Sequence, residues 1–460
     1  MSLQLSIPFQ LIAVTPVVEA ADSSLVLASI LLSLVVIYLA SKLGGEICTR
    51  FNLPPVLGEL VGGVVVGTSV LNLLVFSESG ATAEDSLLMK FLVLTSSLTS
   101  ENAGAVFAAQ SEVISSLSEL GVVILLFEIG LESDLKELIR VGPKAAIVAV
   151  VGVVTPFALG TLGLVYLFHV PVIPSVFAGA ALTATSIGIT AKVLAEIGRL
   201  SSSEGQIIIG AAVLDDVLGI IVLAVVSSLV KTGEIQITNV IFLVISAAVF
   251  LIGAIVLGRF LGPFLVKLMD NMQTRGKVLL VSLVFAFILS YIAQVIQLEA
   301  ILGSFAAGLV LAETTKQSEL EEQILPVADL FVPLFFVCVG AQTDLGVLNP
   351  AIPENRAGLA IAAFLIVVAI FGKVVTGFAI FGKEQLNRLA IGVGMIPRGE
   401  VGLVFAGVGA ASGALDAATQ TAIIMMVIIT TFIAPPLLRV VFDKDQPSVT
   451  LAEKSQEPSS

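Results

Sequence analysis

The chain has 460 residues, of which 57% are hydrophobic and 12% are charged, and its mean hydropathy is +1.09. This composition is typical of a polytopic membrane protein and excludes an ordinary soluble domain. A net charge of −13 and a single histidine argue against a nucleic-acid partner, a histidine-based pH sensor and a multi-histidine metal site. The two cysteines lie far apart and predict neither a disulfide nor a zinc site.

Residues 1–22 form an apolar leader that Pro8 and Pro16 interrupt. A faint cleavage-site pattern is present around Glu19, but the basic region that begins a signal peptide is missing. We therefore expect an interfacial or disordered leader rather than one that is removed.

The hydropathy pattern predicts an all-α polytopic membrane protein with about thirteen transmembrane helices. The long polar connection from Ser77 to Ser116 is expected to be a surface loop, with an amphipathic helix inside it as the alternative. Residues 443–460 are charged and rich in Pro and Ser, which predicts a disordered tail. The expected spans are 23–45, 55–76, 117–132, 143–168, 174–196, 205–230, 236–262, 276–296, 299–313, 324–342, 357–381, 387–411 and 417–442.

The basic residues of the loops predict the orientation of the chain. Lys90, Lys231 and Arg356 fall on one side, whereas most other lysines and arginines fall on the opposite side. Because cytoplasmic loops are enriched in Lys and Arg, the N-terminus is expected outside or in a lumen and the C-terminus in the cytoplasm. A bacterial inner membrane is the expected location, or a thylakoid membrane if the host is photosynthetic.

Two short motifs recur in the two halves of the chain. Residues 56–63, VLGELVGG, resemble residues 301–308, ILGSFAAG, and residues 130–135, GLESDL, resemble residues 340–345, GAQTDL. Both matches join spans that are seven apart, and because seven is odd the two units have opposite orientations. Inverted-topology repeats are typical of secondary transporters, whose binding site lies near the membrane midplane.

The span 205–230 carries two adjacent acids, Asp215 and Asp216, at its centre. An ionisable group there costs at least about 2.5–3.5 kcal/mol on insertion scales. Adjacent helical positions differ by about 100°, so the carboxylates point to different faces but repel when both are ionised. A basic side chain, a proton or a metal ion is expected to reach the pair, although a purely structural acid pair is the alternative.

Two spans contain residues that interrupt helices. The fifth span has hydroxyls at Thr183, Thr185 and the following serine, and the twelfth contains Pro397 within the sequence MIPRGE. Irregular backbone at this depth is tolerated only where it lines a cavity or is buried in protein. Two broken helices facing each other would oppose partial charges, which Arg398 and Glu400 are expected to neutralise. A softened helix and an ordinary proline kink are the alternatives.

The predicted spans contain further charged residues, and three of them are candidates for a function. Lys373 is too far from the end of its span to reach water easily, so a buried acid, Asp215 or Asp216, is its expected partner. Glu59 and Glu128 are candidates for the path of an ion, although Glu59 lies close to the end of its span.

The TATS, LDD, GK and PRGE segments, in this order, resemble those of monovalent cation:proton antiporters. The similarity is strongest to bacterial Na⁺/H⁺ antiporters of the second cation:proton antiporter family, the NapA-type and the cyanobacterial NhaS-type, and it covers the whole chain except both tails. It implies an NhaA/NapA-like fold with two crossing discontinuous helices. It also implies a homodimer that takes part in pH homeostasis and salt tolerance, without a soluble regulatory domain in the chain.

The resemblance also implies that the helices form separate domains. Residues 23–132 and 276–342 would form a dimer, or scaffold, domain, residues 143–230 and 357–442 a moving core domain, and residues 236–262 a linker helix. Asp216 would be the main ion-binding carboxylate and Asp215 the acid paired with Lys373. Thr183, Ala184 and Thr185 would supply oxygen atoms beside the ion, and Arg398 and Glu400 would stabilise the crossing.

The expected function is secondary transport, not enzymatic catalysis. The transported ions are expected to be Na⁺, and also Li⁺, in exchange for H⁺, with no cofactor. In the family, an Asp–Asp pair implies electrogenic exchange. A K⁺/H⁺ antiporter or K⁺ efflux system of the same family is the alternative. A cation channel and a sodium-coupled solute symporter fit less well, because of the predicted repeats and the scarcity of specificity groups such as Tyr and Trp.

Overall fold

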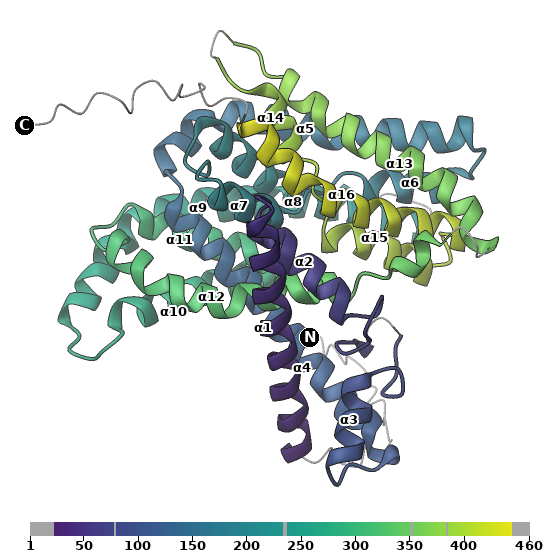
Figure 1. The fold of residues 1–460 in the computed structure, drawn as a ribbon. Coiled ribbons are helices and arrows are strands. Elements are labelled where there is room, and N and C mark those ends of the chain that lie inside the picture. The colour runs from purple at the N-terminus through teal and green to yellow at the C-terminus, as the bar shows by residue number, and fades with distance from the viewer. Residues whose placement is uncertain (1–22, 78–79, 233–236, 350–352, 383–384, 444–460) are drawn as a thin grey trace, which may run out of the picture.

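The computed structural model of the chain describes residues 23–77, 80–232, 237–349, 353–382 and 385–443, and within these residues it contains helices and no strands (Figure 1). The expected leader and residues 444–460 of the expected tail lie outside the described residues. The helices are α1 (Ser23–Arg50), α2 (Pro55–Val66), α3 (Leu87–Thr95), α4 (Ser100–Glu132), α5 (Leu135–Leu167), α6 (Val172–Ala181), α7 (Ile187–Glu196), α8 (Ser203–Thr232), α9 (Ile237–Asn271), α10 (Lys277–Val295), α11 (Ala300–Ala312), α12 (Gln317–Ala341), the short 3₁₀ helix η2 (Leu345–Leu348), α13 (Pro353–Phe378), α14 (Arg388–Gly394), α15 (Glu400–Ala411) and α16 (Ala417–Asp443).

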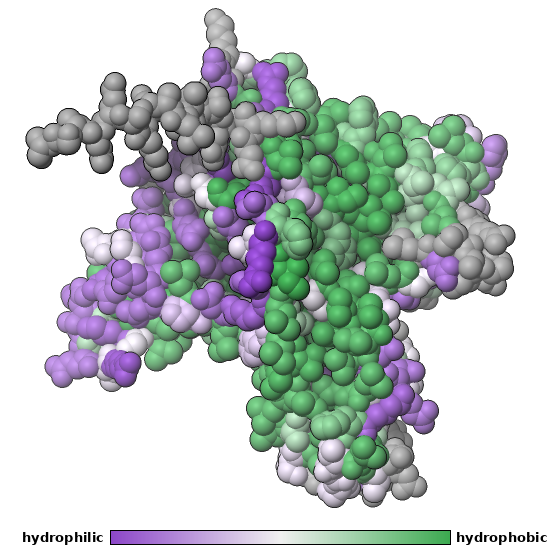
Figure 2. Space-filling view, viewed as in Figure 1, coloured by the Kyte–Doolittle hydropathy of each residue, from purple (hydrophilic) through white to green (hydrophobic). Residues whose placement is uncertain are grey.

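Among the described residues, eight helices are long and apolar enough to cross a membrane. Helix α1 also exposes an apolar face. This face carries side chains that recur every four residues and are each more than half exposed, namely Leu27, Leu31, Val35, Leu39 and Leu43. Figure 2 shows apolar surface over α1 and over the side formed by α13 and α16. A continuous apolar surface of this kind faces lipid in an integral membrane protein.

The expected number of about thirteen transmembrane helices stays a prediction, because several apolar helices are too short to cross a bilayer alone. Two predicted spans each consist of two shorter helices, α6 with α7 and α14 with α15. The second predicted span is also short, since α2 ends at Val66 and not near residue 76.

The expectation of a surface loop from Ser77 to Ser116 is wrong. Helix α4 begins at Ser100, and α3 occupies part of the remaining segment. Ala103, Val106, Phe107 and Ile114 of α4 lie on one buried face at helical spacing. Polar residues between them lower the mean hydropathy, so a search for a continuous apolar run misses this part of the helix.

The helices form two groups by their contacts. Helices α1, α2, α4, α10, α11 and α12 pack against one another, and α5, α6, α8, α13, α14, α15 and α16 do the same. In Figure 1 the first group lies at the lower left and centre and the second at the upper right. Helix α9 contacts both α8 and α11, and α7 contacts α4, α2 and α16, so these two helices lie between the groups.

The repeated glycines make equivalent contacts in the first group. A Cβ atom added to Gly63 of α2 would lie 2.2 Å from the carbonyl oxygen of Val337 on α12, next to Gly340. A Cβ atom added to Gly308 of α11 would lie 2.3 Å from the carbonyl oxygen of Phe127 on α4, next to Gly130. Because Gly63 corresponds to Gly308 and Gly340 to Gly130, both helix pairs pack as an inverted repeat requires.

These contacts predict that Gly130→Val destabilises the protein, because the added side chain would collide with backbone of α11. Overpacking of this kind costs typically about 1–3 kcal/mol. Gly104→Val on the same helix is the matched control, since no atom lies within 4 Å of a Cβ atom there. Melting of the purified protein in detergent should show a lower Tm for the first variant only; equal Tm values would contradict the close packing.

Candidate ion-binding site

The fifth and twelfth predicted spans are both interrupted. Helix α6 ends at Ala181 and α7 begins at Ile187, while α14 ends at Gly394 and α15 begins at Glu400. Pro397 lies in the second interruption and has no backbone N–H to donate to a helix. The hydroxyl of Thr183 donates to the carbonyl of Ala180 at 2.8 Å and closes the end of α6.

The two interruptions lie against each other and share hydrogen bonds. The backbone N–H of Ser186 donates to the Pro397 carbonyl at 2.8 Å, and the Thr185 hydroxyl donates to the Met395 carbonyl at 3.0 Å. The Thr190 hydroxyl donates to the Gly394 carbonyl at 2.8 Å. Each broken helix therefore satisfies backbone groups of the other, which buried irregular backbone requires.

Arg398 contributes a positive charge where the interruptions meet. Its side chain is fully buried, and its Nη1 donates to the carbonyl oxygen of Ala184. Its own carbonyl accepts a hydrogen bond from the Thr431 hydroxyl at 2.6 Å. Glu400 is the first residue of α15, but its side chain lies outside the part of the chain that the structure describes, so its expected role stays a prediction.

The two central acids of α8 are buried, and one of them forms an ion pair. Asp215 and Lys373 of α13 are both fully buried, and Lys373 Nζ lies 2.9 Å from Asp215 Oδ2. Lys373 Nζ also donates to the carbonyl oxygen of Thr183 at 2.6 Å. The predicted contact between Lys373 and an acid of α8 is therefore present, with Asp215 as the partner.

Sequence reasoning missed one residue that makes this ion pair possible. A Cβ atom added to Gly152 of α5 would lie 3.3 Å from Lys373 Nζ, so this glycine leaves room for the lysine head group. The span 143–168 contains several glycines, and the sequence alone does not distinguish this one.

Asp216 faces a different space from Asp215. Together with Ala184, Thr185 and Ser186 it lines a cavity of about 10 Å³ between the two groups of helices. This volume is near the minimum that holds one water molecule, so the cavity has room for one small ion or water. We call it the Asp216 cavity; Ile187, Gly399, Val401, Glu299 and Ile301 complete its lining.

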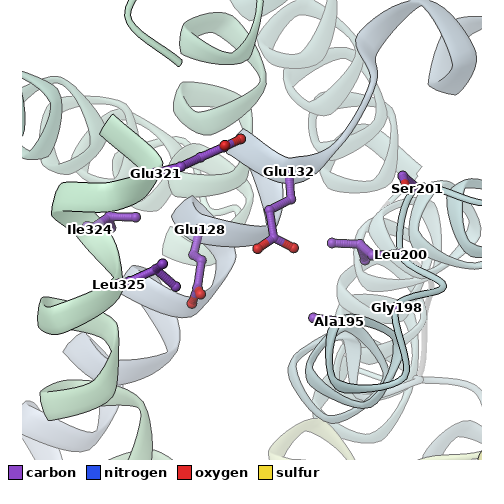
Figure 3. Close-up of a pocket in the computed structure, with 9 residues that line it drawn as sticks. All are labelled: Glu128, Glu132, Ala195, Gly198, Leu200, Ser201, Glu321, Ile324 and Leu325. Atoms are coloured by element: carbon purple, nitrogen blue, oxygen red, sulfur yellow. The ribbon is translucent and has the colours of Figure 1, made fainter. Parts of the chain in front are cut away.

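A larger, acid-lined cavity of about 350 Å³ lies near the last turn of α4 (Figure 3). The carboxylates of Glu128 and Glu132 point toward the same space, and Glu321 of α12 lies at its rim. Glu128 is only 8% exposed, and its Oε2 has no hydrogen-bond partner within the described structure. Glu132 follows Glu128 by four residues, which is a spacing that could have identified it from the sequence.

Glu59, the other acid predicted on an ion path, lies elsewhere. Its Oε1 accepts a hydrogen bond from the Ser41 hydroxyl at 3.0 Å, and it lines neither of the two cavities. Lys192 of α7 lies within electrostatic range of Glu59, Glu128 and Glu132. No pattern in the sequence predicted these neighbours of Lys192.

Comparison with known proteins identifies the kind of protein this chain resembles. The model of a family described as sodium/hydrogen exchanger, transmembrane, matches residues 29–444. The chain is 72% identical over 433 residues to the high-affinity Na⁺/H⁺ antiporter NhaS3 of Synechocystis sp., covering 94% of each chain. It is 32% identical to the Na⁺/H⁺-K⁺ antiporter GerN of Bacillus cereus, over 88% of this chain and 94% of that one.

Solved structures show the same fold. The sodium proton antiporter MjNhaP1 from Methanocaldococcus jannaschii matches with a TM-score of 0.58 at 16% identity. The match covers 91% of this chain and 97% of that chain. The arrangement of helices described above is therefore that of a known antiporter structure.

Proposed function

The chain belongs to the sodium/hydrogen exchanger family, and on this basis we propose that it exchanges Na⁺, and also Li⁺, for H⁺ across a membrane. The observation that supports this function most strongly is the buried Lys373–Asp215 ion pair beside a second buried acid, Asp216. Charged groups inside a membrane are costly and are characteristic of ion and proton pathways.

In the proposed mechanism, a proton and a cation compete for Asp216. A proton and Na⁺ do not neutralise the same carboxylate at once, so binding of one releases the other. Ala184 and Thr185 line the same cavity and offer backbone or hydroxyl oxygens. Such oxygen ligands suit a hard cation. Thr183 lies on the side of Lys373, and we assign its carbonyl to holding the lysine and not the ion.

Lys373 is proposed to hold Asp215 in place through their buried ion pair, so that exchange takes place at Asp216. Because nearby charges in a buried site interact, the lysine influences how the binding of a cation at Asp216 is coupled to the movement of protons. The predicted electrogenic exchange of more than one proton per Na⁺ depends on this coupling.

We propose that transport occurs by movement of a core against a scaffold. Residues 143–230 and 357–442 would form the core, residues 23–132 and 276–342 the scaffold of a homodimer, and residues 236–262 the linker. The proposed site is next to the two interruptions, which share hydrogen bonds, and irregular backbone of this kind is typical of binding sites in secondary transporters. Glu128 would attract cations on the side of the larger cavity, and we propose that this side is the cytoplasmic one, as the predicted orientation of the chain requires.

The proposed function is tested by measuring transport with dye quenching in everted membrane vesicles, to which Na⁺, Li⁺ or K⁺ is added at several pH values. We expect Na⁺ and Li⁺ to dissipate the proton gradient and K⁺ to do so much less. Equal or greater responses to K⁺ would favour the K⁺/H⁺ alternative, which is the second candidate because the chain is similar to a Na⁺/H⁺-K⁺ antiporter of Bacillus cereus. No response to any of the three cations would contradict cation/proton exchange itself.

A further inference from the structure

The Asp216 cavity has a second acid in its wall that the proposed mechanism does not use. Glu299, together with Ile301, is contributed by the segment that begins α11, whereas the other lining residues come from α8, from the two helix interruptions and from the starts of α7 and α15. Glu299 is exposed on the surface of the chain while it also borders the cavity. It is thus a carboxylate located between Asp216 and the outside of the protein.

The Asp216 cavity and the larger acid-lined cavity lie at different depths along one helix. Ile187, the first residue of α7, lines the Asp216 cavity, and Ala195, near the end of α7, lines the larger one. Eight residues of α-helix correspond to about 12 Å. Glu299 and Glu128 therefore border spaces at two separate levels of the same interface.

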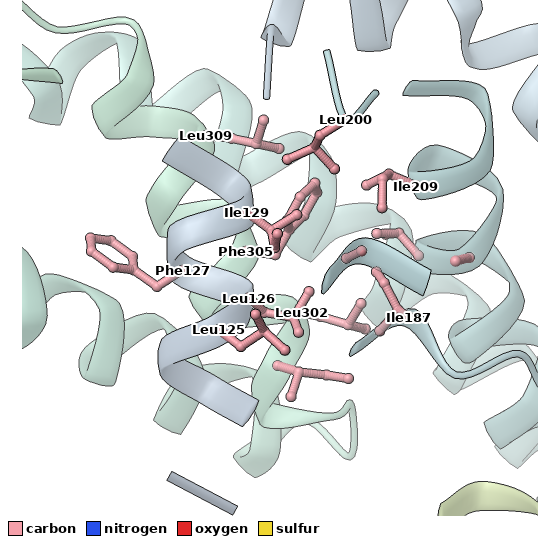
Figure 4. Packing of buried hydrophobic residues seen from close by; sticks show 14 of the residues in the cluster. Leu125, Leu126, Phe127, Ile129, Ile187, Leu200, Ile209, Leu302, Phe305 and Leu309 are labelled. Carbon is pink, nitrogen blue, oxygen red and sulfur yellow. The ribbon is translucent and has the colours of Figure 1, made fainter. Parts of the chain in front are cut away.

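Apolar side chains separate the two levels. Leu125 and Ile129 of α4, Leu302 and Phe305 of α11 and Ile187 of α7 belong to one buried apolar cluster at this interface (Figure 4). The same buried cluster includes Leu200 and Ile209. An apolar layer of this kind does not conduct a hydrated cation, so an ion that leaves toward Glu299 takes a different route from one that leaves toward Glu128.

We propose that Glu299 is the carboxylate that receives the cation on the side of the membrane opposite to Glu128. This inference rests on the proposed function of Asp216. Glu299 precedes α11 but its side chain does not cap the helix, so no structural hydrogen bond in the described structure accounts for its carboxylate there. As a hard oxygen ligand beside the Asp216 cavity, it concentrates Na⁺ where the ion enters or leaves.

The test measures the KM for Na⁺ separately from each side, in everted and in right-side-out membrane vesicles. Glu299→Gln should raise KM about three- to tenfold on one side only and leave kcat nearly unchanged, because only the approach of the ion is weakened. Glu128→Gln should raise KM on the opposite side only. The conservative variant Glu299→Asp keeps a carboxylate, so its KM for Na⁺ should stay close to that of the wild-type protein.

Glu119→Gln is the matched control, since Glu119 is an exposed acid of α4 close to Glu299 that does not line the cavity. A normal KM on both sides is expected for this variant. If Glu299→Gln leaves both KM values unchanged, or raises both equally, the proposal for Glu299 is overturned. Failure of the proposed function is distinct, because wild-type vesicles would then show no Na⁺/H⁺ exchange at all.

Discussion

Asp216→Asn is expected to reduce Na⁺/H⁺ exchange in proteoliposomes by more than about 100-fold, to the level of protein-free vesicles. Mutation of a residue that only orients a metal ligand commonly lowers metal affinity or activity about 10–100-fold. Asp216 is proposed to be the ligand itself, so a larger effect is expected. The amide has nearly the shape of the carboxylate, but it neither releases a proton nor neutralises a cation. Exchange activity near that of the wild-type protein would refute the assignment of the site.

The same variant is expected to fold normally. Asp216 is nearly fully buried on α8, and replacing a buried acid by a neutral group of similar shape removes a desolvation cost. The Tm should therefore equal or exceed that of the wild-type protein. A large decrease in Tm would mean that lost transport reflects lost folding, and Asp216 would then have a structural role.

The central acids and the lysine were predictable because a charge within an apolar span has few explanations. Asp215, Asp216 and Lys373 each stand out in the sequence, and the low dielectric of the membrane predicts that opposite charges meet. The rotation of α8 about its axis, in contrast, could not be predicted from the residues alone. Adjacent residues point about 100° apart, and only the packing of α8 and α13 against the same helix, α5, determines that Asp215, and not Asp216, reaches the lysine. The sequence indicated this pairing only through resemblance to a family.

The interruptions of the two broken helices were predictable from local chemistry, but their contacts were not. Pro397 and the hydroxyls near Thr185 indicate where a helix ends. The hydrogen bonds from Ser186 to Pro397 and from Thr185 to Met395 join residues more than 200 positions apart. No local pattern encodes such a distant partner.

Other features could not be predicted from the sequence because they depend on which residues of a neighbouring helix lie close by. Gly152 matters only because Lys373 comes close to it, and Glu299 only because its helix borders Asp216. Both residues look ordinary in the sequence. The start of α4 was missed for the opposite reason, since its buried face is apolar while its mean hydropathy is low.

The largest effect on stability is expected for Lys373→Met. The substitution removes the charge that neutralises Asp215, and both side chains of the pair are completely buried. Removing one partner of a buried ion pair costs roughly 3–5 kcal/mol, because the other charge stays in the interior without compensation. Thermal melting of the purified variant and of the wild-type protein measures this loss of stability.

The double variant Asp215→Asn/Lys373→Met separates the ion pair from the packing of the lysine. Replacing both charges by neutral groups of similar size is often neutral for stability, so most of the lost Tm should return. Lys136→Met, at an exposed position at the start of α5, is the control for removing a lysine and should leave Tm unchanged. In transport assays, Lys373→Met should alter the pH profile more than the apparent affinity for Na⁺. An unchanged Tm together with an unchanged pH profile would mean that the buried pair neither supports the fold nor sets the coupling of protons to the cation.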